Sequence, residues 1–146
     1  MLLEGKKIGF ALTGSFCTFK KTIPQISKLI EEGAEVLPIM SFNSYNINSR
    51  FGEAKNFIKN IEEITNKKII NTIEEAELIG VRHLTDIMVI APCSRKYNWK
   101  TSKWNYRYSS TYSSQITFKE WKPINNRNSH KWWIIYKFRK HRKANK

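Results

Sequence analysis

Residues 7–13, Lys7-Ile8-Gly9-Phe10-Ala11-Leu12-Thr13, decide the fold of this chain. The run is apolar almost throughout, lacks polar alternation and ends at Gly14, which is typical of a parallel strand covered on both faces. Two similar runs follow at 34–41 and 86–91, with helical patterns between them. Strands that alternate with helices in this way predict an α/β fold with a parallel sheet and flanking helices.

The segments between these strands carry helical signals. Apolar residues recur at helical spacing from 16 to 30, and Gly33 closes the pattern as a C-cap. Pro24 lies inside this pattern and predicts a kink or a restart near Ile23. A second helix is predicted over 50–65, after a polar loop at 42–49.

Three shorter features complete the pattern. Thr72 and Glu75 form a capping box for a brief helix that ends at Gly80. Residues 68–70 are a short strand candidate. Pro38 cannot donate to a sheet ladder, so we expect it at an unpaired point or a bulge of the second strand.

The carboxyl ends of the parallel strands form the predicted ligand edge, because ligands in open α/β sheets bind there. Gly14 permits close approach, and the helix start after it suits a phosphate group. A tight turn with an N-cap explains Gly14 and Ser15 equally well, and Ser41 can be a turn former. The candidate binding residues are Thr13, Gly14, Ser15, Phe16, Ser41, Pro92 and Cys93.

Several functional classes lack support in the sequence. No catalytic acid or base can be named, no metal-ligand spacing exists, and His83 is interpreted as a solvated surface residue. Cys17 and Cys93 are interpreted as reduced thiols that behave as small buried hydrophobes. No signal peptide and no apolar run that could span a bilayer is visible, which predicts a soluble cytoplasmic protein without membrane association.

The composition changes abruptly after Ser94. Residues 1–94 hold 11 Lys or Arg and 11 Asp or Glu, whereas residues 95–146 hold 15 Lys or Arg and one acid, Glu120. The second segment has all five Trp but no Gly, Leu, Val, Asp, Met or Cys. We therefore predict part of an α/β domain at 1–94 and a basic aromatic tail at 95–146 that is not natively folded.

The first segment resembles a known family. Residues 8–19, Ile8-Gly9-Phe10-Ala11-Leu12-Thr13-Gly14-Ser15-Phe16-Cys17-Thr18-Phe19, are similar to the opening of the dipicolinate synthase B-subunit family, and 35–41 and 85–93 match it in register. This family is related to the phosphopantothenoylcysteine decarboxylase flavoproteins. The resemblance implies a Rossmann-like, flavodoxin-like domain that is incomplete here at its C-terminal side.

The resemblance also implies a function and a site. The family's B-subunit, together with an A-subunit, forms dipicolinate from a dihydrodipicolinate-type precursor during sporulation, as part of an oxidoreductase. FMN is expected at Gly14, Ser15, Phe16, Ser41, Pro92 and Cys93, and NADP is expected on the partner, the dipicolinate synthase A-subunit. The intact family is expected to be oligomeric and to act on a small-molecule substrate.

Residues 95–146 are interpreted as the product of a one-base frameshift near codon 94. Trp has the single codon TGG, which becomes a glycine codon when it is read one base later, so Trp99 and Trp104 would both become Gly. Read in this way, residues 95–110 can encode the Gly-Asn-Thr-Ile-Gly continuation that the family carries after its Ala-Pro-Cys segment. The chain as written is then expected to be unstable and inactive, with the strand at 86–91 left as an exposed apolar edge.

Two alternative functions stay open. The chain can be another FMN-binding flavoprotein of the decarboxylase group. It can also be a small α/β module whose basic tail binds nucleic acid through stacked aromatic side chains, although nucleic acid is the less favoured partner. In that case residues 131–136 can form a strand or a membrane-surface segment.

The frameshift is tested by the nucleotide sequence across codons 92–97. We expect the neighbouring reading frame to encode the glycine-rich continuation without an early stop codon. Stop codons or an unrelated sequence in that frame would exclude the interpretation.

Overall fold

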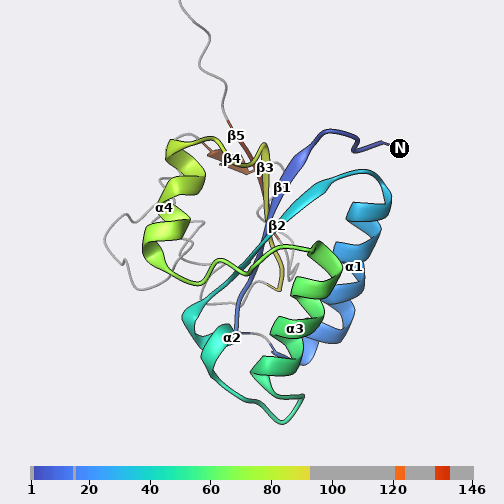
Figure 1. The fold of residues 1–146 in the computed structure, drawn as a ribbon, viewed down its shortest axis with the longest axis vertical. Coiled ribbons are helices and arrows are strands. Elements are labelled where there is room, and N and C mark those ends of the chain that lie inside the picture. Colours follow the sequence, from blue (N-terminus) through green and yellow to red (C-terminus); the bar gives the residue numbers. More distant parts are fainter. Residues whose placement is uncertain (1, 15, 93–120, 124–133, 139–146) are drawn as a thin grey trace, which may run out of the picture.

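The computed structural model describes residues 2–14, 16–92, 121–123 and 134–138. Their elements alternate between strand and helix up to residue 90, as predicted (Figure 1). In chain order they are β1 (Lys7–Leu12), the 3-10 turn η1 (Phe16–Thr18), α1 (Phe19–Glu31), β2 (Glu35–Met40), α2 (Phe42–Asn46), α3 (Ala54–Thr65), α4 (Ile73–Val81), β3 (Ile87–Ile90), β4 (Trp121–Pro123) and β5 (Ile134–Phe138).

The strands form one sheet in the order β2-β1-β3-β5-β4. β1 pairs in parallel with β2 on one side and with β3 on the other, so Ile8 lies between Val36 and Ile87. This three-strand parallel sheet with flanking helices is the flavodoxin-like, Rossmann-like arrangement that we predicted. β5 runs antiparallel to both β3 and β4.

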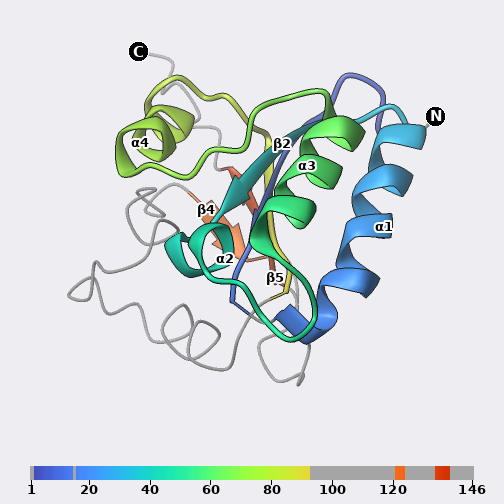
Figure 2. The ribbon, with the colours of Figure 1, turned by 60° about the horizontal axis from the view of Figure 1, so that its bottom comes forward.

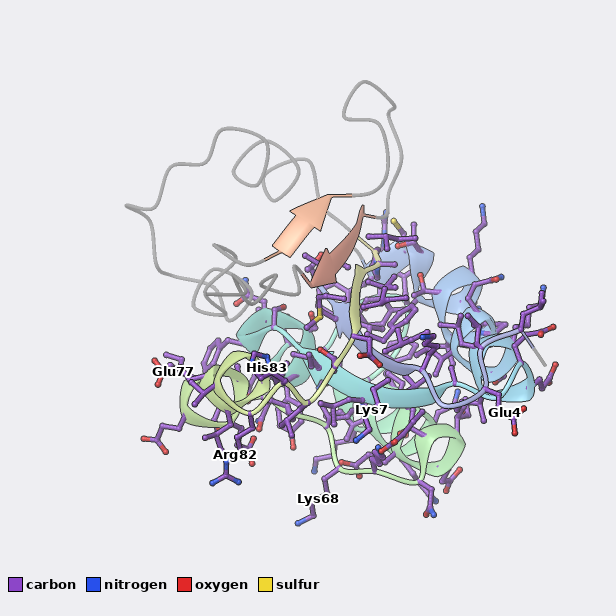
Figure 3. The ribbon with its side chains drawn as sticks, turned by 90° about the horizontal axis from the view of Figure 1, so that it is seen from above. Glu4, Lys7, Lys68, Glu77, Arg82 and His83 are labelled. Atoms are coloured by element: carbon purple, nitrogen blue, oxygen red, sulfur yellow. The ribbon has the colours of Figure 1, made fainter. Side chains whose placement is uncertain are left out.

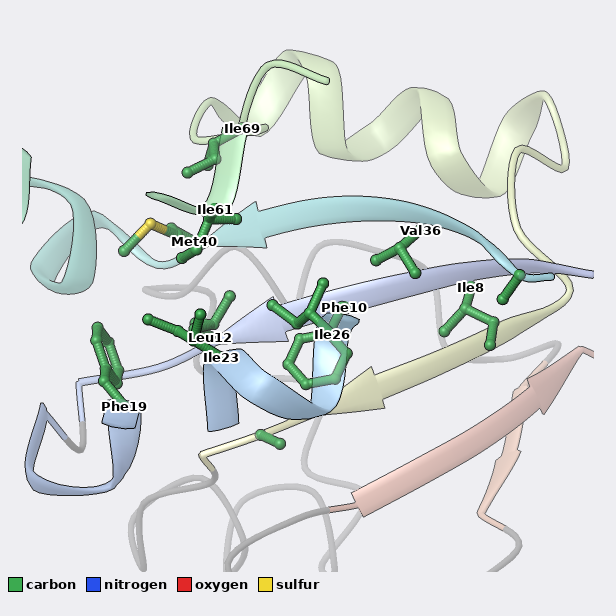
Figure 4. Close-up of a cluster of buried hydrophobic side chains, with 12 residues drawn as sticks. Ile8, Phe10, Leu12, Phe19, Ile23, Ile26, Val36, Met40, Ile61 and Ile69 are labelled. Carbon is green, nitrogen blue, oxygen red and sulfur yellow. The ribbon is translucent and has the colours of Figure 1, made fainter. Parts of the chain in front are cut away.

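β1 is a strand because both of its faces are covered. Ile8, Phe10 and Leu12 point into a core that α1 and α3 close, at 3%, 2% and 0% exposure (Figure 4). Ala11 faces the opposite side, where α4 packs through Ala76 and the rest of a second cluster. Figure 2 shows α1 and α3 side by side, with α4 across the strands from them.

α1 buries Phe19, Ile23 and Ile26 and runs without interruption through Pro24. The predicted restart near Ile23 is therefore wrong. One missing N–H costs less than the helix gains from its buried stripe, since packing of an amphipathic face supplies most helix stability in proteins. Gly33 has φ +90° and follows the end of the helix, as predicted for its C-cap.

Two predicted segments differ from the structure. Residues 68–70 do not form a strand, because Ile70 alone makes an isolated parallel bridge with Ile39. The predicted loop at 42–49 contains the five-residue helix α2. α3 begins at Ala54 rather than at residue 50. At this start the Ala54 N–H donates a hydrogen bond to the Asn48 side-chain oxygen at 2.9 Å.

Pro38 lies within the regular ladder of β2, in register with Phe10, so the predicted unpaired point or bulge is wrong. The Pro38 carbonyl accepts a hydrogen bond from the Ile70 N–H at 2.9 Å, so residue 38 turns its polar backbone atoms away from β1. The missing N–H therefore lies on the outer edge of β2, where no strand is paired among the described residues.

The expectation of an exposed edge at the predicted strand 86–91 is wrong. β5 pairs with β3 from Ile87 to Ile90, with Ile134 opposite Ile90. β5 shares residues 134–136 with the segment 131–136, for which the sequence left a strand as one of two alternatives. That the tail as a whole is not natively folded stays a prediction.

The outer surface of the domain is charged. Glu77 and Arg82 of the α4 region point away from the strands (Figure 3), and His83 is exposed. Glu35 at the start of β2 pairs with Lys67, which follows α3. The hydrogen bond from Lys67 and its charge lower the pKa of Glu35 despite a small opposing effect of burial.

Removal of the Ile26 side chain tests the larger core. Ile26→Ala is expected to lower the free energy of unfolding by about 3 kcal/mol, because it leaves a cavity between α1 and β1. The exposed neighbour is the control: Gln25→Ala should change it by less than about 0.5 kcal/mol. Urea denaturation measures both, and equal effects would contradict this description of the core.

The ion pair between Glu35 and Lys67 predicts a pH dependence. Because the pKa of Glu35 is lowered on folding, its stabilisation is present above the unfolded-state pKa and is lost as the pH falls through the folded-state pKa. Lys67→Met should reduce the free energy of unfolding by roughly 0.5 kcal/mol near neutral pH at low salt. In acid the variant and the unsubstituted chain should be equally stable, and a difference that persists there would contradict this.

Candidate functional site

The predicted ligand edge exists in the structure as the ends of β1, β2 and β3. Thr13 and Gly14 follow β1, Ser41 follows β2, and Pro92 follows β3 by two residues. Because the three strands are parallel and in register, these residues lie at one edge of the sheet. Ser15 and Cys93 lie outside the described residues, so their predicted roles stay predictions.

Thr13 ties β1 to the end of β3. Its hydroxyl donates to the carbonyl oxygen of Pro92 at 2.5 Å, and the residue is 1% exposed. The Ala91 N–H donates to the Ala11 carbonyl at 2.9 Å on the same side. The peptide between Ala91 and Pro92 is cis. Thr13 therefore belongs to the support of the edge, because its hydroxyl is buried and engaged.

Ser41 ties β1 to the end of β2. Its backbone N–H donates to the Leu12 carbonyl at 3.0 Å, and its side-chain oxygen caps α2 by accepting from the Ser44 N–H at 3.3 Å. Ser41 is 9% exposed and Ser44 is fully buried. The sequence analysis did not single out Ser44. Its signal is a second serine three residues after the first, which is the spacing of a helix cap.

Gly14 is the exposed point of this edge. A Cβ atom built on it would meet no described atom within 4 Å, and the residue makes no hydrogen bond with another described residue. Its backbone is thus accessible between two buried supports. An accessible backbone at the carboxyl end of a central strand fits a phosphate group, which is bound through N–H donors.

Phe16 and Cys17 differ in their surroundings. The centroid of the Phe16 ring lies 5.3 Å from that of the Phe19 ring, and Phe16 packs against the larger core. Part of the ring is therefore covered by the domain itself. Cys17 is an exposed free thiol one residue later. Its exposure contradicts the interpretation of Cys17 as a buried hydrophobe.

The edge carries no ionisable catalytic group among its described residues. The described residues also contain no group of three or more His, Cys, Asp or Glu side chains that could hold a metal ion. Within the same residues, no helix is both long and apolar enough to cross a bilayer. The chemistry that this edge offers is binding through backbone and neutral polar groups.

An open groove of about 710 Å³ lies between the end of α2, with Asn48 after it, and α3. Its lining mixes both charges and includes Tyr45, Asn48, Lys55, Lys59 and Glu62. None of the predicted binding residues lines it, and no sequence pattern indicates it. The groove and the predicted ligand edge are therefore separate features.

Comparisons with known proteins identify the relatives of this domain. The model of the family described as Flavoprotein matches residues 2–97. Over 90 residues the chain is 49% identical to the dipicolinate synthase B-subunit of Bacillus subtilis (strain 168), an alignment that covers 62% of this chain and 45% of that protein. The crystal structure of the dipicolinate synthase B-subunit from Bacillus halodurans is also similar, with a TM-score of 0.65 and 32% identity over 80% of this chain and 58% of that one.

The chain spans about half the length of these two relatives. The family match covers the described residues from β1 to β3, including the edge at Gly14. With most of its length matched and its parallel sheet shared with a solved relative, the chain belongs to the Flavoprotein family.

Proposed function

We propose that residues 1–94 are the N-terminal part of a flavin-binding subunit of the dipicolinate synthase type. The observation that carries the proposal is the accessible Gly14 backbone, held between the buried hydroxyls of Thr13 and Ser44 at the carboxyl end of β1. The identity of 49% to a dipicolinate synthase B-subunit supports this subunit type over the other flavoproteins of the family.

The flavin site is the edge formed by the ends of β1, β2 and β3. The phosphate group of FMN lies at Gly14 and Ser15, where backbone donors are expected, and the ring or the substrate lies towards Pro92 and Cys93. When bound, the flavin supplies a group that can accept or donate two electrons. The described residues contribute binding and orientation, since none of those at the edge has a side chain that ionises near neutral pH.

The proposed reaction is the two-electron oxidation of a dihydrodipicolinate-type precursor to dipicolinate. It requires a partner, the A-subunit, which is expected to carry NADP as the electron acceptor. We place this reaction in the cytoplasm of sporulating cells, in an oligomeric assembly. A flavoprotein of the decarboxylase group is the alternative within the family, and capture of the A-subunit by the chain would separate the two.

The chain as written is proposed to lack this activity. In the reading frame that we infer from the Trp codons, the residues after Cys93 would complete the far side of the ligand edge. In the written frame residues 95–146 have a different sequence, in which 15 residues are Lys or Arg.

Flavin loading tests the proposal. The product of the restored reading frame is expected to purify with visible flavin absorption, whereas the chain as written should lose flavin. Gly14→Val in the restored product should weaken FMN binding at least about tenfold, because the side chain occupies the approach to the backbone. Asn60→Ala, on the exposed side of α3, is the control and should leave the affinity unchanged.

A restored product that binds no flavin would overturn the proposed flavin site. A monodisperse, flavin-loaded preparation of the chain as written would instead overturn the proposal that this chain lacks the activity.

A further inference from the structure

Ser44 is a fully buried polar side chain beside the ligand edge. It is 0% exposed, whereas Ser41, three residues earlier, keeps 9% of its surface exposed. The two side-chain oxygens lie 2.6 Å apart. Of this pair only Ser41, which the sequence analysis placed among the binding residues, can touch a ligand. Any effect of Ser44 on a ligand must therefore pass through other atoms of the protein.

Ser44 offers two hydrogen-bond donors to the Ser41 side-chain oxygen. The Ser44 N–H donates to that oxygen at 3.3 Å, and the 2.6 Å contact allows the Ser44 hydroxyl to donate to it as well. A serine oxygen has two acceptor positions and one proton. When Ser44 fills both acceptor positions, Ser41 can only donate to a further partner, and a phosphate oxygen accepts such a bond.

The Leu12 carbonyl allows the two hydroxyls to change roles. Without a ligand, the Ser44 hydroxyl donates to that carbonyl at 3.1 Å, and the Ser41 hydroxyl can donate to Ser44. When Ser41 turns its proton outward, Ser44 can turn its own proton to Ser41. The Leu12 carbonyl then keeps the hydrogen bond from the Ser41 N–H at 3.0 Å. Neither arrangement leaves a group of this set without a partner, so the change avoids the cost of an unsatisfied buried group.

We propose that Ser44 is a positioning residue of the flavin site: it holds the Ser41 side-chain oxygen and leaves the Ser41 hydroxyl as a donor to the phosphate group of FMN. This assignment deepens the proposed function and rests on it for its relation to flavin. A hydroxyl that receives a hydrogen bond is polarised towards donating one, so the pair binds an anionic oxygen better than Ser41 alone. The contact itself stays with Ser41, as the sequence predicts.

Coupled substitutions test whether Ser44 acts through Ser41. In the restored-frame product, Ser41→Ala should weaken FMN binding at least about tenfold, because it removes a donor to a charged group. Ser44→Ala should weaken it about fivefold, and the double variant should lose no more than about twofold beyond Ser41→Ala. Thr65→Val is the matched control, since it removes another buried hydroxyl, bound to the Ile61 carbonyl at 2.8 Å on α3. It should change the affinity by less than about twofold.

Two results of this series would overturn the assignment. One is a double variant whose loss equals the product of the two single losses, because Ser44 would then act independently of Ser41. The other is an unchanged phosphorus NMR signal of the bound FMN phosphate in Ser44→Ala, since a displaced donor must alter the surroundings of that group. The control Thr65→Val should leave this signal in place.

A measurement without ligand keeps this assignment apart from the proposed function. The three-bond Hα–Hβ couplings of Ser41 report its side-chain rotamer, which should be single in the unsubstituted restored product and averaged in Ser44→Ala. An unchanged single rotamer in Ser44→Ala would overturn the positioning role, whether or not FMN binds. If the unsubstituted restored product binds no FMN, the proposed function fails, and the couplings still decide whether Ser44 holds Ser41.

Discussion

The structure depends on one constraint, the burial of β1 on both faces between two parallel neighbours. Every backbone group of this strand must find a partner in β2 or β3, because water cannot reach it. The first and last residues of β1 find partners just outside the neighbouring strands: the Lys7 N–H donates to the Asp86 carboxylate at 3.0 Å, and the Leu12 carbonyl accepts from the Ser41 N–H. The position of Gly14 follows from this central strand rather than from contacts of its own.

The parts of the fold that β1 organises were predictable from the sequence. The strands at β1, β2 and β3 are short apolar runs, and runs of this kind have few other stable environments in a small protein. The caps at Gly33 and Thr72 are local, so residue type alone indicates them. At Thr72 the side chain accepts the Glu75 N–H at 3.3 Å, as a capping box requires.

The errors have local physical causes. α2 is five residues long, which is too short for a periodic pattern, and α3 starts late because the turn from Ser49 to Gly52 is fixed by its own backbone bonds. Ile70 pairs with β2 through a single bridge. The two adjacent apolar residues Ile69 and Ile70 give the same sequence pattern for a single bridge as for a short strand. Ser44 could not be recognised as part of the site, because its role depends on a carbonyl that is 32 residues away in the sequence.

The outward-facing Pro38 limits how the sheet can grow. Beside β2 the backbone offers no donor at residue 38, and Ile70 already uses the carbonyl of that residue and the N–H of Met40. The other side of the three parallel strands is β3, the side nearest Pro92, where β5 pairs in this structure. A parallel newcomer would deliver its carboxyl end and the loop after it to the ligand edge, whereas β5 runs the other way and brings its first residue, Ile134, opposite Ile90. The direction of a single neighbouring strand thus determines whether the crevice gains a fourth contributing loop or only the beginning of a strand.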